Sequence, residues 1–197
     1  MPQNRPQPDE YASFYGKYVA LVPEGELLSS LETQLQGFHA ALGPLSDAQG
    51  DFCYAEGKWS IKEMLGHISD TERIFGYRLL RIARGDRTPL SGFEQDDYVK
   101  EGNFAGRKLG DVLEEFSAVR RASVALLRSL DDAAWLRRGT ANQKEVTVTA
   151  LFQLAPPLVE VKASREVSLA FSMGTITVPL GCTRGCPPVP CAWSAVI

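Results

Sequence analysis

Apolar residues recur at three- and four-residue steps in three separate segments of the chain, which is the periodicity of amphipathic α-helices. The stripes consist of Leu27, Leu28, Leu31, Leu35, Phe38 and Leu42, then Ile61, Leu65, Ile68, Phe75, Leu79 and Ile82, then Leu109, Val112, Leu113, Phe116, Val119, Leu126, Leu127 and Leu130. Pro44 ends the first helix, and residues 86–106 lose the pattern and form a long connection. A fourth helix begins near Val146 and meets Pro156 and Pro157. Three helices with one apolar stripe each need a fourth surface, so the pattern predicts an all-α four-helix bundle with one long crossover.

The start of the second helix has the clearest local signal. Ser60 is a natural N-cap, and Glu63, three residues later, completes a capping box. Trp59 before the cap and Met64 after it are placed to form a hydrophobic staple. The apolar stripe then continues as far as Gly85, so we expect one helix between the cap and this glycine.

The composition of the chain changes abruptly after the predicted bundle. Residues 51–150 contain 32 charged side chains, whereas residues 151–197 contain five, together with six prolines. We therefore divide the chain into a polar N-terminal extension (1–17), a helical bundle (18–155) and an atypical tail rich in Pro, Gly and Cys (156–197). Residues 171–178 have the composition of a short strand, but a strand without a partner is unstable. We expect most of the tail to be poorly ordered.

Charge and cysteine content narrow the function classes. The net charge of -3 gives no basic surface for nucleic acid or an anionic membrane. No apolar stretch is long enough to cross a bilayer, and Met1–Asp9 does not resemble a secretory signal, so we expect a soluble, cytoplasmic protein. Cys53 stands alone, and the spacing of Cys182, Cys186 and Cys191 does not match the paired C-x-x-C pattern of structural zinc sites.

Two residues of the second helix are candidates for chemistry. On a helical wheel His67 lies at the edge of the apolar stripe, and Glu72 lies inside it. A carboxylate in that position requires either an ion-pair partner from another helix or a metal and its ligands, and the sequence leaves both open. His67 is either a packed histidine or a metal ligand. His39 has no acidic or histidine partner one turn further on, and we interpret it as structural or exposed.

The segment Gly57–Arg73, with its Trp-Ser…His…Asp-x-Glu pattern, resembles the first metal-ligand motif of the DinB-like (DinB/YfiT) family. The similarity continues in shorter stretches and covers roughly residues 18–152. The resemblance implies an antiparallel four-helix bundle, often a homodimer, with nickel or zinc held by three histidines, the first of which His67 matches. It also implies metal-dependent hydrolysis or thiol-dependent transfer or isomerisation of a small molecule whose identity stays open.

The chain departs from this family where the last helix should supply an H-x-x-x-H pair. The pair would fall near Leu158 and Lys162, neither of which replaces an imidazole, and the two prolines before them would break the helix. We therefore predict a degenerate DinB-like member with an incomplete metal site. In this site His67 is a metal ligand, and Glu72 and Glu63 lie behind the ligand and support it by hydrogen bonds. The alternative is an active metal-dependent hydrolase or thiol-dependent transferase. One hypothesis for the abrupt change is that residues after about 153 are translated from another reading frame. The alternative is a natural variant whose tail folds back and replaces the surface of the lost helix.

Overall fold

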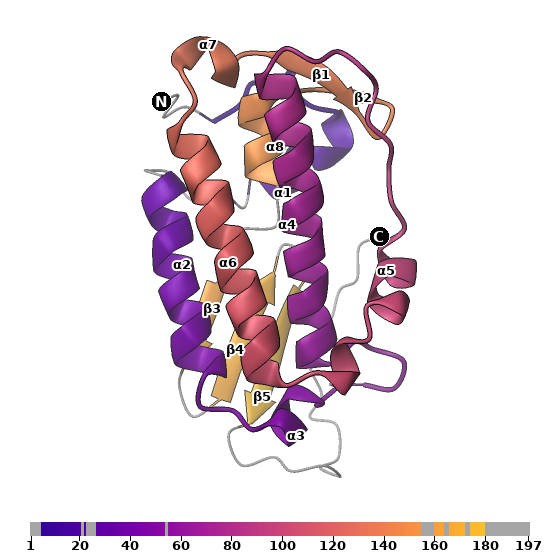
Figure 1. Ribbon diagram of the computed structural model, residues 1–197, viewed down its shortest axis with the longest axis vertical. Coiled ribbons are helices and arrows are strands. Elements are labelled where there is room, and N and C mark those ends of the chain that lie inside the picture. Colours follow the sequence, from indigo (N-terminus) through magenta and orange to yellow (C-terminus); the bar gives the residue numbers. More distant parts are fainter. Residues whose placement is uncertain are drawn as a thin grey trace.

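The computed structural model describes residues 5–20, 22, 27–53, 55–154, 160–163, 166–171 and 174–179. Three long helices, α2 (Leu27–Leu42), α4 (Ile61–Ala83) and α6 (Leu109–Arg128), lie side by side (Figure 1). They coincide with the three apolar stripes, so the helical prediction for these segments is confirmed. Short elements lie before, between and after them: η1 (Ser13–Tyr15), α1 (Gly16–Val19), α3 (Asp47–Gly50) and α7 (Asp132–Trp135).

Helix α4 begins as its sequence predicts. The Ser60 hydroxyl accepts a hydrogen bond from the backbone N–H of Glu63 at 3.2 Å, and the Glu63 carboxylate accepts one from the Ser60 N–H at 2.7 Å. This reciprocal pair is the predicted capping box. Trp59 packs against the apolar cluster that contains Met64, in agreement with the proposed staple.

The other end of α4 is closed by Gly85, whose φ of 82° lies in the left-handed region. The N–H of Gly85 donates to the carbonyl of Ile82 at 2.9 Å, and the N–H of Asp86 donates to the carbonyl of Arg81 at 3.0 Å. These two bonds form a Schellman motif, which satisfies the last carbonyls of the helix and turns the chain away.

A short helix and a small sheet together provide the fourth surface of the bundle. Helix α8 (Val148–Leu154) lies beside α4 and stops where the prolines follow. Strands β3 (Glu160–Ala163), β4 (Glu166–Phe171) and β5 (Gly174–Pro179) form an antiparallel sheet, and β3 lies against α2. Figure 1 shows this sheet in the half of the bundle that α8 does not reach.

The sheet corrects one expectation about the tail. A strand within 171–178 was predicted as an isolated element, but β5 pairs along its length with β4, which pairs in turn with β3. Strand β5 therefore lies at the edge of a three-stranded sheet, and its pairing with β4 supplies what a single strand lacks. The expectation that most of the tail is poorly ordered concerns residues that are largely outside the described part of the chain.

The long connection between α4 and α6 contains two short elements that its sequence pattern did not reveal. It contains α5 (Gln95–Glu101) and the short η2 (Phe104–Gly106). The ring of Phe104 rests on Gly66 of α4, where an added Cβ would lie 2.4 Å from the ring. A glycine one turn into α4 therefore allows the crossover to pack directly on the helix.

A hairpin follows α7, and periodicity did not reveal it. Strands β1 (Arg138–Ala141) and β2 (Lys144–Thr147) pair antiparallel around Asn142 and Gln143, whose φ values are 49° and 62°. Two left-handed residues form the tight turn that suits the twist of a hairpin. The fourth helix consequently begins at Val148, two residues later than predicted.

Apolar packing is divided into two clusters along the bundle axis. One joins α2, α4 and α6, and its rings Phe38 and Phe116 lie 4.7 Å apart. The other joins the second half of α4 to α8, α7 and the hairpin, with Trp135 and Phe152 in edge contact. Within the described residues no helix is long and apolar enough to cross a membrane.

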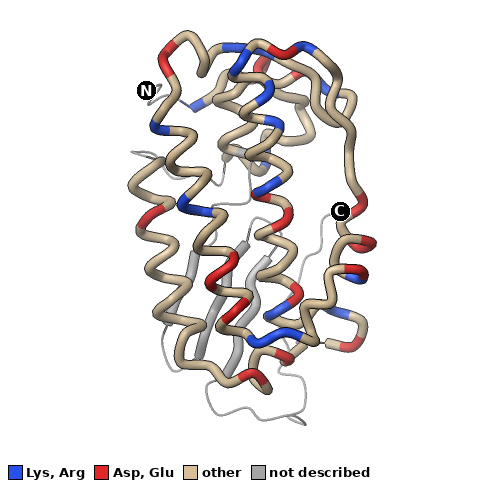
Figure 2. Tube along the Cα trace, in the orientation of Figure 1, with Lys and Arg blue, Asp and Glu red and all other residues tan. Residues whose placement is uncertain are grey.

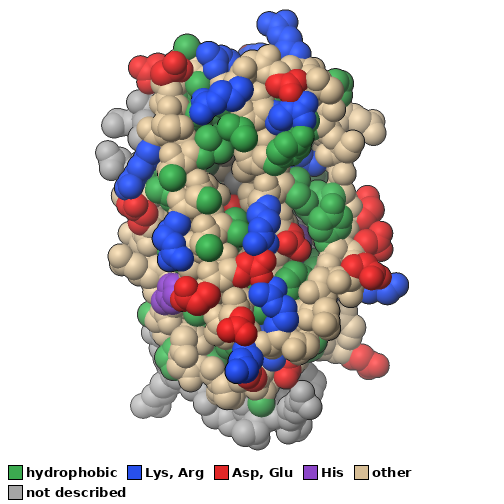
Figure 3. All heavy atoms as spheres, in the orientation of Figure 1, with side chains coloured by type: hydrophobic (Ala, Val, Ile, Leu, Met, Phe, Trp, Pro, Cys, Tyr) green, Lys and Arg blue, Asp and Glu red, His purple; other side chains and the backbone are tan. Residues whose placement is uncertain are grey.

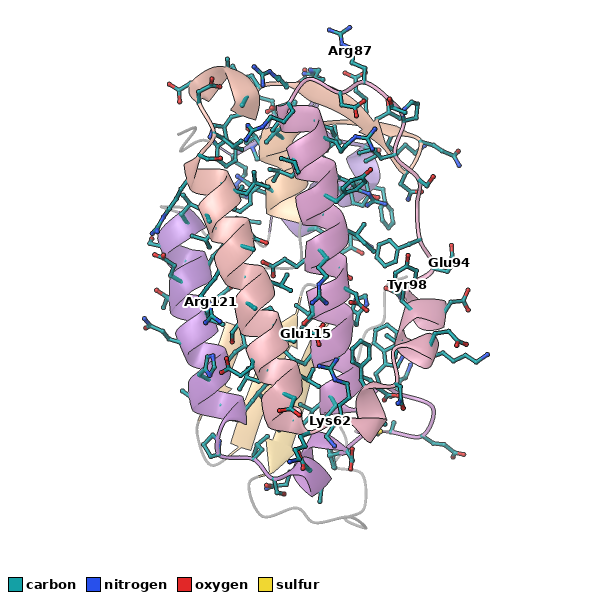
Figure 4. The ribbon with its side chains drawn as sticks, in the orientation of Figure 1. Lys62, Arg87, Glu94, Tyr98, Glu115 and Arg121 are labelled. Carbon is teal, nitrogen blue, oxygen red and sulfur yellow. The ribbon has the colours of Figure 1, made fainter. Side chains whose placement is uncertain are left out.

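The outer face of α4 and α6 carries interspersed acidic and basic side chains (Figures 2 and 3). Glu115 accepts from Arg73 at 2.7 Å and from Arg107 at 2.5 Å, which ties α6 to α4 and to the end of the crossover. Figure 4 shows Glu115 on this face. Mixed charges in such pairs are typical of a solvated surface.

Candidate functional site

His67 lies in the second turn of α4, and its side chain faces the crossover. It is 6% exposed, its ring centre lies 4.8 Å from that of Trp59, and its Nδ1 lies 3.4 Å from the Thr71 hydroxyl. Burial lowers the pKa of His67 to about 4, and the charge of Asp96 on α5 opposes this shift only in part. The imidazole is therefore neutral at neutral pH, which is the form that binds metals and accepts hydrogen bonds.

The described residues do not supply a set of partners for this imidazole. No group of three or more His, Cys, Asp or Glu side chains close enough to hold a metal occurs among them. His39 lies on α2 with its Nε2 2.7 Å from the Ser117 hydroxyl, in the structural role that the sequence suggested. Lys162, at one of the two positions where a histidine was sought, lies on strand β3 instead of a helix, and Leu158 lies outside the described residues.

The cysteines do not change this result within the described chain. Cys53 is exposed, and its Sγ lies 3.7 Å from the carbonyl oxygen of Asp51. Partial burial, with smaller effects of Glu63 and Asp51, raises the pKa of the Cys53 thiol, so it is not an activated thiolate. The three tail cysteines lie outside the described residues. A site with three protein ligands, which catalytic zinc usually has, does not fit the donor groups found around His67.

Glu72 is paired with a cation from α6. Both of its carboxylate oxygens accept hydrogen bonds from Nε of Arg120, at 2.9 and 3.0 Å, and the two side chains are 7% and 1% exposed. Nη1 of Arg120 also donates to the carbonyl of Leu31 and to Gln34, both on α2. Of the two interpretations left open for Glu72, the structure shows the buried ion pair, and this pair connects all three long helices.

Glu63, the other acidic candidate, is engaged at the start of α4. Its carboxylate accepts from the Ser60 N–H, which explains its place in the sequence without a metal. That Glu63 and Glu72 support a metal ligand stays a prediction, as does metal binding by His67 itself.

Sequence reasoning missed two charged residues that define these environments. Arg120 is four residues after Phe116 and therefore falls within the apolar stripe of α6, where a charged residue signals a buried partner. Asp96 had no such signal, because only the fold of the crossover brings α5 against α4.

The fold is that of a helical-bundle protein with a buried imidazole on one of its long helices. The sequence places the chain in one superfamily of such proteins. The model of the DinB superfamily matches residues 30–156, and the chain belongs to this superfamily. The match ends where the two prolines begin. No functionally curated protein matches the chain.

Solved structures of YfiT and of a maleylpyruvate isomerase share the fold. YfiT from Bacillus subtilis, described as a probable metal-dependent hydrolase with an unusual four-helix bundle topology, is 17% identical with a TM-score of 0.60. The likeness covers 77% of this chain and 83% of YfiT. A mycothiol-dependent maleylpyruvate isomerase is 13% identical with a TM-score of 0.53, over 64% of this chain and 52% of the isomerase. The chain thus spans about half of the isomerase, and at these identities the likeness concerns the fold alone.

Proposed function

We propose that this protein is a DinB-superfamily bundle with an incomplete metal centre, which acts by binding a partner or small molecule and not by metal-dependent catalysis. One observation carries the proposal: His67, the residue that corresponds to the family's first ligand, is buried without two further donor side chains among the described residues. A single imidazole binds a divalent ion far more weakly than three ligands do, because each additional protein ligand adds its own binding energy to an already fixed ion.

The second candidate is a metal-dependent hydrolase or a thiol-dependent transferase. The neutral state of His67 favours it, because an imidazole with a pKa of about 4 needs no deprotonation before it binds a metal. YfiT, with the same fold, is described as a probable metal-dependent hydrolase. In this candidate the missing ligands come from the residues after 179, which include three cysteines. A bound nickel or zinc ion would then polarise a water molecule or a substrate oxygen.

Metal content separates the two candidates. The protein is purified without a histidine tag, incubated with nickel or zinc, desalted and analysed for metal, together with the variants His67→Ala and His39→Ala. The two histidines are the only ones in the chain, so His39→Ala is the matched control. We expect less than one tenth of an equivalent of metal in all three proteins, roughly the occupancy left after desalting a weak single-ligand site.

A stoichiometric ion that persists in His39→Ala and disappears in His67→Ala would refute the proposal. In that case, replacement of Cys182, Cys186 and Cys191 by alanine shows whether the tail supplies the other ligands. Loss of the ion in this triple variant would mean that the tail cysteines bind it, as the metal-dependent hydrolase or thiol-dependent transferase requires.

A further inference from the structure

A polar cleft lies at the end of the bundle where α4 meets the β1–β2 hairpin. It has a volume of about 490 Å³. Its lining comprises Gly85, Arg87, Arg137, Arg138, Gly139, Thr140 and Glu145. This volume is within the range of small-molecule sites, but the lining is polar where such sites are usually apolar. The cleft therefore suits a small ligand that is itself strongly polar.

Two features of the local fold create the cleft. The left-handed Gly85 turns the chain away from α4, and Gly139 allows the hairpin to approach the helix, since a Cβ there would lie 2.6 Å from the Ile82 side chain. Arg137 then donates to the carbonyl of Ala83 in the last turn of α4, which fixes the position of the hairpin. A cation at this position also complements the partial negative charge of the helix end.

The lining carries three guanidinium groups and one carboxylate, which leaves an excess of positive charge. Arg138 is already paired, with Asp9 at 2.8 Å and with Glu145 at 3.2 Å. The Arg87 side chain has no ion pair or hydrogen bond with any described residue, and the Thr140 hydroxyl is likewise without a partner in the described chain. Figure 4 shows Arg87 extending from the end of the molecule, beyond α4. A guanidinium at the mouth of the cleft and a hydroxyl in its lining are thus available as donors, on a surface with an excess of positive charge.

We propose that this cleft binds an oxyanion, specifically the phosphate group of a small molecule or free phosphate. Arg87 and Arg137 offer planar guanidinium groups that match the oxygens of a phosphate, and Thr140 adds a hydroxyl donor. A doubly charged anion gains more from the excess positive charge than a monocarboxylate does. Glu145 opposes the ligand and weakens the site.

This site is separate from the environment of His67. The two lie near opposite ends of α4, and 18 residues at the helical rise place them about 27 Å apart along the axis. Binding of phosphate therefore neither requires nor tests the metal chemistry discussed above.

The test follows the backbone amides of Gly85 and Gly139 by ¹H–¹⁵N NMR while inorganic phosphate is added at constant ionic strength. Saturable shifts of both glycines are expected in the native protein. The variant Arg87→Ala, which removes a side chain without protein partners, should weaken binding about tenfold, the loss typical of one charge-assisted hydrogen bond. Glu145→Gln should tighten binding, because it removes the carboxylate of the lining.

Arg121→Ala is the matched control, since Arg121 is also an exposed arginine but lies on α6, away from the cleft (Figure 4). It should bind phosphate as the native protein does. Equal affinity in the native and Arg87→Ala proteins, or an equal loss in Arg121→Ala, would overturn the proposal, as would shifts that do not saturate. Phenyl phosphate distinguishes the two possible ligands of the cleft. If it binds more tightly than inorganic phosphate, the ligand is a phosphorylated small molecule; if it binds more weakly, the ligand is free phosphate.

Discussion

The buried pair of Glu72 and Arg120 makes the strongest prediction about stability. Replacing Glu72 by leucine leaves the guanidinium of Arg120, 1% exposed, without its counter-charge in the middle of the bundle. Replacing Arg120 by leucine leaves the Glu72 carboxylate in the same position and also removes the donor to Leu31 and Gln34. Each single change should lower the free energy of unfolding by about 3–5 kcal/mol, because an uncompensated buried charge is costly.

The double variant Glu72→Leu/Arg120→Leu should be much less damaging than the sum of the two. It removes both charges together, and an apolar replacement of a buried pair is often close to neutral. Loss of the hydrogen bonds to α2 limits this gain, and we expect a net cost of at most about 2 kcal/mol. The coupling energy between the two positions is then at least about 4 kcal/mol.

Urea unfolding, followed by far-ultraviolet circular dichroism, gives the free energy of unfolding of the native protein, the two single variants and the double variant. Equal m-values show that all four expose the same amount of surface on unfolding. The exposed pair Glu32–Arg128 is the matched control, since it also joins α2 to α6, with side chains 46% and 57% exposed. Glu32→Gln should cost less than about 1 kcal/mol. Our reasoning fails if Glu72→Leu costs as little as this control, or if the two leucine substitutions are additive.

Three further predictions concern α4, α6 and His67. Gly66→Ala should lower the free energy of unfolding, measured with urea, by about 1–3 kcal/mol, because the new methyl group collides with Phe104. Gly110→Ala on α6 is the control: no atom lies within 4 Å of the added methyl group, and the free energy of unfolding should rise by about 0.5–1 kcal/mol. Ser60→Ala should cost about 1 kcal/mol through loss of the N-cap, and a loss below about 0.3 kcal/mol would contradict the capping role. The unfolded imidazole of His67 has a pKa near 6.5 and the folded one about 4, so the unfolded state takes up a proton first as the pH falls. The contribution of the neutral His67 to the free energy of unfolding should therefore be complete above pH 6.5 and decrease between pH 6.5 and 4, by up to about 3 kcal/mol. The variant His67→Gln should lack this part of the pH dependence.

The sequence determined most of the local structure. The apolar stripes identified α2, α4 and α6, and the capping box identified the first residue of α4, because these signals depend on neighbours within one or two turns. The same local reading detected the change in composition after residue 153, close to the end of the superfamily match at residue 156.

Only the tertiary structure decided which distant groups meet. It selected Arg120 as the partner of Glu72, brought Asp96 towards His67, and placed strand β3 of the small sheet against α2. It also joined the end of α4 to the hairpin, which creates the arginine-lined cleft from residues about fifty positions apart. Periodicity reports which face of a helix is buried but not what is packed on it, because that choice depends on how the connections bring separate elements together.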